Sequence, residues 1–105
     1  ALTKALTELC EDFLENVEGF QWLTHKVNYS NFPSSLKITC VFDTNERVKK
    51  LLNSRDESTL ISQISTICNH LNITLKNISA HVGFDSEERC DIEHQGNWAQ
   101  RLQRH

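Results

Sequence analysis

Apolar residues near the start of the chain recur at steps of three and four, which is the spacing of one face of an α-helix. Gly19 follows this stripe, at the position where a left-handed residue commonly ends a helix. The pattern predicts an amphipathic helix that ends before Gly19. Its stripe comprises Leu2, Ala5, Leu6, Leu9, Cys10, Phe13, Leu14 and Val17.

Two segments with strand character come next. Residues 20–29 are rich in aromatic and β-branched side chains, and in residues 36–42 apolar and other positions alternate. Both features are typical of β-strands. Residues 30–35, which include Pro33, have the composition of a turn, so we expect an antiparallel hairpin.

Three pairs of residues in the second half of the chain have the spacing of a capping box, in which a polar N-cap is followed three residues later by Glu. They predict three helix starts: a short helix through Val48 and Leu51, a longer helix with Leu60, Ile64 and Cys68 on one face, and a helix from about Ser86 to His94. The pairs are Asp43 with Glu46, Ser54 with Glu57, and Asp85 with Glu88.

Residues 73–84 predict a third strand, in which a change of parity at Lys76–Asn77 suggests a bulge. Gly96 then ends the last predicted helix, and Asn97 can cap a final turn. The order helix, strand, strand, helix, helix, strand, helix predicts one α+β domain over residues 1–105. We expect a two-layer sandwich whose sheet is covered mainly by the first and third helices. The pattern leaves open which strand the third one pairs with.

Composition narrows the class of protein. The 105 residues are 38% hydrophobic and 24% charged, which excludes a disordered or fibrous chain, and the length excludes a multidomain enzyme. The sequence contains no run of about 20 apolar residues, so we expect no membrane contact. The formal net charge of -3 makes nucleic acid an unfavourable partner.

The four cysteines bear on the redox compartment. Cys10, Cys40 and Cys68 fall on apolar stripes, where a free thiol behaves as a small hydrophobe. We therefore expect a reduced, cytoplasmic protein rather than a secreted one with two disulfides. The secreted alternative draws on three glycosylation-type motifs, which begin at Asn28, Asn72 and Asn77.

Reactive side chains concentrate between Phe84 and Trp98. Cys90 and His94 are one helical turn apart and could form a metal or thiol site with His81, but no second ligand pair has diagnostic spacing. The surrounding acids disfavour a thiolate. We expect no catalytic residue, no cofactor and no enzyme activity.

The C-terminal segment from Phe84 to Leu102 is the preferred interaction surface. Its candidate contact residues are Asp85, Glu88, Glu93, His94, Asn97 and Trp98. A structural alternative is a clasp, in which Asp85 caps the helix and Cys90 and Ile92 point inward. Gly96 then lets Trp98 and Leu102 fold back onto the rest of the domain.

Two further surfaces are candidates. A nucleic-acid-associated regulator could use the cationic segment that contains Arg47, Lys49, Lys50 and Arg55. Residues 58–75 carry no formal charge, and the outward positions of this helix could form a homodimer or partner contact. Those positions are Ser62, Ser65, Thr66 and Asn69.

Several segments spread over nearly the whole chain resemble a family of small uncharacterised bacterial proteins, whose members are often labelled transcriptional regulators of the Fis type. The resemblance implies a bacterial cytosolic protein and provides no catalytic residues to carry over. With the residue patterns, it leads us to expect a small binding or regulatory module that acts through protein–protein contact. The similar segments are Gly19–His25, the Pro33 turn, Val41–Asn45, Phe84–Glu88, Cys90, Glu93–His94, Gly96–Trp98 and Arg101–Leu102.

Overall fold

The chain opens with the predicted amphipathic helix. In the computed structural model, which describes residues 2–32 and 34–103, α1 (Leu2–Asn16) places Leu6, Leu9 and Phe13 in the core. Gly19 has a φ of +84°, so the prediction of a left-handed residue after this helix is confirmed. A Cβ at this position would lie 2.8 Å from the Arg47 side chain. The turn therefore requires glycine both for its backbone angle and for space.

The predicted hairpin is present. Strand β1 (Phe20–Lys26) pairs antiparallel with β2 (Lys37–Phe42), and a short 3₁₀ turn, η1 (Tyr29–Asn31), lies between them. The register shifts between Phe20 and Trp22, which is the signature of a bulge. Because of this shift, Phe20 and Leu23 both contribute to the core although they are three residues apart. Pro33, in the predicted turn, lies outside the described residues.

The third strand is shorter than predicted. Strand β3 spans only Val82–Ser86; a 3₁₀ turn, η2 (Ile78–His81), precedes it, and residues 73–77 form a loop. The predicted strand over residues 73–84 and its bulge at Lys76–Asn77 were therefore wrong. Ile73 is buried, but its amide bonds back to the carbonyl of Cys68 at the end of the preceding helix, 2.8 Å away. The apolar character of Ile73 indicated its burial correctly, but a residue can be buried without lying in a strand.

Strand β3 pairs with β2 in parallel, which gives the sheet order β1-β2-β3 and settles the question that the pattern left open. The connection from β2 to β3 contains α2 (Asn45–Leu52) and α3 (Asp56–His70). After β3 come α4 (Glu87–His94) and the short α5 (Trp98–Leu102). The fold class is α+β, and the element order agrees with the prediction, with a short final helix added.

The capping prediction was wrong in detail at all three boxes. The Thr44 hydroxyl caps α2 and the Ser86 hydroxyl caps α4, each one residue after the predicted aspartate. Ser54 accepts from the Asp56 amide, but α3 begins without a side-chain cap at the N-cap position. Asp43 accepts instead from its neighbour Thr44, 2.8 Å away, so the aspartate is used in the turn before the helix.

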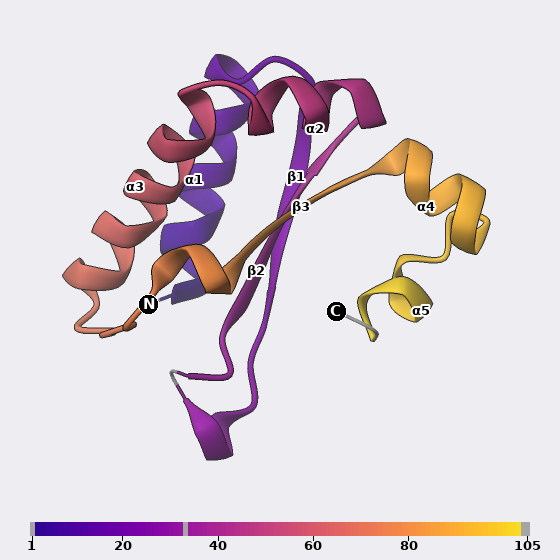
Figure 1. Cartoon of the computed structure of the whole chain (residues 1–105). Coiled ribbons are helices and arrows are strands. Elements are labelled where there is room, and N and C mark those ends of the chain that lie inside the picture. The colour runs from indigo at the N-terminus through magenta and orange to yellow at the C-terminus, as the bar shows by residue number, and fades with distance from the viewer. Residues whose placement is uncertain (1, 33, 104–105) are drawn as a thin grey trace.

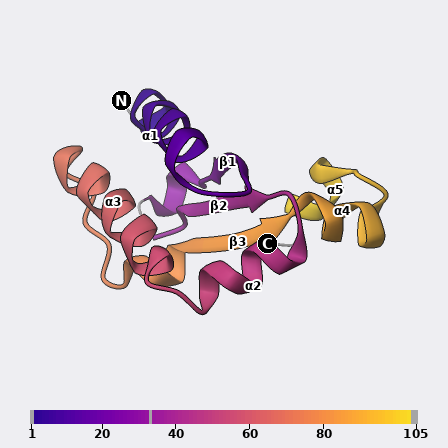
Figure 2. The ribbon, with the colours of Figure 1, turned by 90° about the horizontal axis from the view of Figure 1, so that it is seen from above.

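Helices lie on both sides of the sheet (Figure 1). Helices α1 and α3 cover one face, α4 and α5 lie on the other side, and α2 runs beside β3, as the view in Figure 2 also shows. The main core lies under α1 and α3 and includes Phe13, Ile38, Cys40, Phe42 and Ile64. Of the helices in the described ranges, none combines the length and apolar character needed to cross a membrane.

The cysteines are free thiols, and three of them are fully buried. Cys40 lies at the centre of the sheet with none of its surface exposed. Burial raises the pKa of the Cys40 thiol to about 12, because the thiolate would lose its hydration. Burial also raises the pKa values of Cys68 and Cys90.

We predict that Cys40 makes the domain sensitive to alkali. The thiol of the unfolded chain ionises near pH 8.5, whereas the folded one does not, so the unfolded state binds fewer protons above about pH 9. The free energy of unfolding should then fall by about 1.4 kcal/mol per pH unit for this group, up to about pH 12. Urea titrations from pH 7 to 10.5 should show a shallower fall in Cys40→Ala. Val41→Ala, which truncates a buried neighbour, should keep the steeper slope; equal slopes in all three proteins would contradict the prediction.

Candidate functional site

A buried ion pair joins the end of β3 to the last helix. Arg101 donates from Nε to Oδ2 of Asp85 over 2.6 Å and from Nη2 to Oδ1 over 2.9 Å, so the pair is bidentate. Both residues are nearly inaccessible to solvent. Hydrogen bonding to Asp85 is the main reason that the pKa of Arg101 is raised above its usual value.

The remaining terminal nitrogen of Arg101 contacts α4. Its Nη1 donates to Oε1 of Glu93 at 3.0 Å and lies 3.1 Å from Nδ1 of His94. Because a guanidinium has no acceptor, Nδ1 of His94 must be the acceptor in this contact. One arginine therefore holds the strand and both C-terminal helices together.

A carboxylate also joins the two tryptophans of the chain. Trp22 of β1 donates from Nε1 to Oε1 of Glu87 over 2.6 Å, and Trp98 of α5 donates to Oε2 over 3.0 Å. The two rings meet edge to face, with centroids 4.8 Å apart. Trp98 thus folds back onto the sheet, as the clasp interpretation predicted.

The two strand-to-helix junctions at the same edge of the sheet, β2 to α2 and β3 to α4, are bonded to each other. The Glu88 amide donates to the carbonyl of Asp43 over 3.1 Å, and the Asn45 amide donates to Oε1 of Glu88 over 2.8 Å. Ser86 adds a hydroxyl bond of 2.5 Å to Oδ1 of Asn45. Since β2 and β3 are parallel, the helices that follow them begin side by side, and these bonds fix their spacing.

The predicted interaction residues are largely used inside the domain. Asp85 and Glu93 bind Arg101, Glu88 links α4 to the start of α2, and Trp98 contacts Trp22 and Glu87. Asn97 caps α5 by accepting from the Gln100 amide over 3.0 Å, as predicted.

Two details of the predicted clasp were wrong. Asp85 pairs with Arg101 and leaves the capping of α4 to Ser86. Cys90 is buried as predicted, but Ile92 is 72% exposed. Residues two positions apart in a helix point about 200° away from each other around its axis, so Cys90 and Ile92 cannot both face inward.

The candidate metal or thiol site is not assembled. His81 lies before β3, whereas Cys90 and His94 lie on the helix after it, so the strand separates them. His81 is half-buried in η2, and its Nδ1 lies 2.7 Å from the carbonyl oxygen of Leu36. Within residues 2–32 and 34–103, no three or more His, Cys, Asp or Glu side chains come together to hold a metal ion.

The four cations of the predicted nucleic-acid surface do not lie on a single helix. Arg47 forms ion pairs with Glu18 and, at 3.9 Å, with Asp43, and the hydrogen bond to Glu18 raises its pKa. Lys49, Lys50 and Arg55 are exposed, but Arg55 lies beyond α2 at the start of α3. In the part of α3 that carries no formal charge, Ser62, Thr66 and Asn69 are exposed and Ser65 is partly buried.

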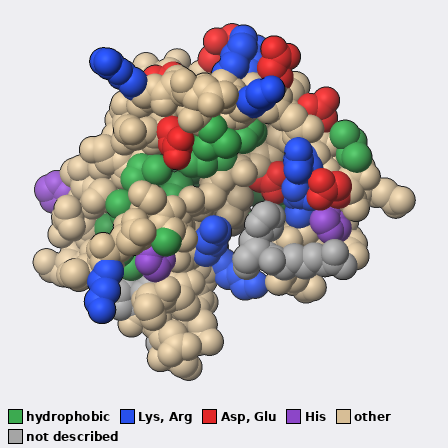
Figure 3. Space-filling model, in the orientation of Figure 1, with side chains coloured by type: hydrophobic (Ala, Val, Ile, Leu, Met, Phe, Trp, Pro, Cys, Tyr) green, Lys and Arg blue, Asp and Glu red, His purple; other side chains and the backbone are tan. Residues whose placement is uncertain are grey.

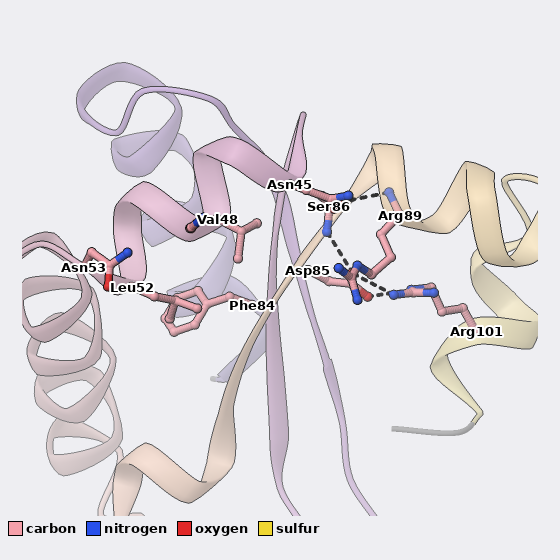
Figure 4. Close-up of a pocket in the computed structure, with 10 residues that line it drawn as sticks. Asn45, Val48, Leu52, Asn53, Phe84, Asp85, Ser86, Arg89 and Arg101 are labelled. Carbon is pink, nitrogen blue, oxygen red and sulfur yellow. Dashed lines mark hydrogen bonds and ion pairs between the residues drawn. The ribbon is translucent and has the colours of Figure 1, made fainter.

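A groove lies between α2 and the end of β3. This groove has a volume of about 660 Å³. Figure 4 shows α2 above it, β3 below it and the side chains of α4 and α5 at its far wall. The residues of α2 that line it are three and four apart and so share one helical face. The lining residues are Asn45, Val48, Lys49, Leu52, Asn53, Phe84, Asp85, Ser86, Arg89 and Arg101.

The groove combines an apolar strip with positive charge. Leu52 is 47% exposed, and the partly buried Val48 and Phe84 lie next to it (Figure 4). Figure 3 shows hydrophobic side chains gathered below α2 on this face of the molecule. Lys49 and Arg89 add two cations, while the charges of Asp85 and Arg101 neutralise each other. The groove therefore favours a ligand with both apolar and acidic groups.

Sequence reasoning missed most of this site. Val48 was predicted to lie in a short helix and Phe84 in a strand, and neither Val48 nor Leu52 was assigned to a binding surface. The adjacent pair Leu51–Leu52 carried the available signal, since neighbouring residues of a helix point about 100° apart. Leu51 is the buried member of the pair.

Together, the fold and the groove define a small α+β domain with a partly apolar, cationic groove beside the last strand of its sheet. Searches of protein-family models, of curated proteins and of solved structures find no match to this chain. The resemblance to small bacterial proteins labelled as Fis-type regulators therefore stays a prediction.

We predict that Arg101→Ala destabilises the domain strongly, because it leaves Asp85 charged and without its arginine in a buried position. Breaking a buried ion pair costs about 3–5 kcal/mol. In the double variant Asp85→Ala/Arg101→Ala, the loss should be smaller than the sum of the two single losses. Urea unfolding of the four proteins gives this comparison, and additive losses would contradict the pairing.

We predict that the tryptophan pair contributes more to stability than His94 does. Trp98→Ala removes the edge-to-face contact and one charged hydrogen bond, and should lower the free energy of unfolding by about 2 kcal/mol or more. His94→Ala should change it by less than about 1 kcal/mol, since Arg101 keeps its bonds to Asp85 and Glu93. Thermal melts monitored by tryptophan fluorescence and circular dichroism test which variant is less stable. A larger loss of stability in His94→Ala than in Trp98→Ala would contradict the prediction.

Proposed function

We propose that this protein is a small binding module that acts through protein–protein contact, and that its docking site is the groove between α2 and the end of β3. The observation that carries the proposal is the exposed Leu52 beside Phe84 in a hollow with cationic walls. Large side chains that stay accessible in a concave site are a common mark of a binding surface.

The walls of the groove are held by bonds that do not involve a ligand. The link through Glu88 fixes α2 relative to α4, and the Asp85–Arg101 pair fixes the far wall. A partner would therefore lose little free energy in ordering the site, because a preorganised surface reduces the entropy cost of association.

The groove offers binding chemistry rather than reactive groups. Its polar residues in the described chain are amides, cations, Asp85 and the hydroxyl of Ser86. Asp85 is bonded to Arg101, and Ser86 donates to Asn45 while it accepts from the Arg89 amide. Because these polar groups are already bonded within the domain, they support a docking role.

The proposed role also reassigns the C-terminal segment. The sequence favoured residues 84–102 as a contact surface, and we now propose that this segment acts mainly as a support. It contributes Phe84, Arg89 and Arg101 to the groove, while α2 contributes the apolar Val48 and Leu52.

Selection from a displayed library of random peptides, with the protein immobilised, tests this function. We expect binders whose affinity falls at least tenfold in Leu52→Asp. Leu14→Asp is a matched control, since Leu14 is a leucine of similar exposure on α1, away from the groove. Circular dichroism should show that both variants stay folded. A selection without binders, or binders equally sensitive to both variants, would contradict the proposal.

A further inference from the structure

Strand β3 is an edge strand beside the groove. In the sheet order β1-β2-β3, its outer side has no neighbouring strand in the described part of the chain. An edge strand presents backbone donors and acceptors that another extended chain can pair with. The groove-lining face of α2 runs along this edge (Figures 2 and 4).

We infer that the partner of the groove is an extended acidic peptide segment with alternating apolar residues, which adds to the outer edge of β3 as a fourth strand. This inference rests on the proposed function and specifies the conformation and chemistry of the ligand. Strand addition to a sheet edge is a recurrent mode of peptide recognition, in which backbone bonds give affinity and pockets for alternate side chains give specificity.

The two sides of β3 differ in chemistry, which accounts for the alternation. Phe84 lies opposite Cys40 and so shares the side of the sheet that α1 and α3 cover, where it lies next to Val48 and Leu52 of α2. Asp85, the next residue, faces the other side, where Arg101 binds it. Side chains of an added strand would alternate between these two sides. Every second residue would thus meet the apolar strip.

The charges of the groove account for the acidic residues. Lys49 is exposed on the α2 wall, and Arg89 is exposed on the α4 wall with a single ion pair of 3.7 Å to Glu93. The chain as a whole has a formal net charge of -3, so this cationic site stands out against an acidic protein. A basic segment would be repelled by both walls.

The length of the segment is also limited. β3 has five residues, between η2 and α4. At a rise of about 3.3 Å per residue, pairing can extend over roughly 17 Å, so a peptide of about six residues suffices.

The test uses fluorescein-labelled hexapeptides and fluorescence polarisation. The probe alternates glutamate and valine, and its counterpart alternates lysine and valine. Two further versions of the acidic peptide carry N-methyl groups on alternate backbone nitrogens, in one phase or in the other. Only one edge of an added strand faces β3, so methylation in one phase should abolish binding and methylation in the other should preserve it.

We expect the acidic peptide to bind at least tenfold more tightly than the basic one. Lys49→Glu and Arg89→Glu should each weaken it tenfold or more, and Lys4→Glu, on the exposed side of α1, should not. Equal binding of both methylated versions would overturn the strand geometry, and stronger binding of the basic peptide would overturn the charge argument. Displacement of the acidic peptide by an oligothymidine would also overturn the inference, in favour of a nucleic-acid ligand. The proposed function fails separately, when the library yields no binder that depends on Leu52.

Discussion

The buried pair of Asp85 and Arg101 is the interaction on which the C-terminal half of the structure depends. It connects the last strand to the last helix across sixteen residues, and the same guanidinium reaches Glu93 and His94. Removing two charges from water is costly, so a buried pair is weak evidence for stability in itself. Its consequence here is the placement of α5, because the bidentate bonds of Arg101 to Asp85 fix where this helix lies relative to β3. The tryptophans and Glu87 then secure that placement from β1.

A second constraint follows from the parallel pairing of β2 and β3. Two parallel strands end at the same edge of the sheet, so the strand-to-helix junctions after them are neighbours and the two helices begin together. The bonds between these junctions involve Asp43, Asn45, Ser86 and Glu88. The groove is the space left between α2 and the end of β3, and its shape is therefore a property of the sheet as much as of the lining residues.

The electrostatics of the chain fit the proposed role. An acidic surface repels acidic ligands in general, while the cations at the groove attract them locally. Charge arrangements of this kind contribute to the orientation and rate of association more than to affinity, which the apolar contacts of Leu52 and Phe84 would supply. Docking as an added strand would also occupy the outer edge of β3, and unpaired strand edges otherwise favour nonspecific pairing between chains.

The sequence by itself determined the elements that depend on local periodicity and local turn chemistry. Most of the stripe of α1, the left-handed Gly19, the hairpin, the cap at Asn97 and the inward cysteines could be predicted, since each depends mainly on local patterns in the sequence. Leu14 departs from the predicted stripe, because it is exposed. The tertiary structure decided the rest. Whether β3 lies beside β1 or β2, where it begins, and whether Asp85 caps a helix or binds Arg101 depend on residues far away in the chain. The groove belongs to this second group, because its walls come from segments more than thirty residues apart and exist only after β2 and β3 have paired.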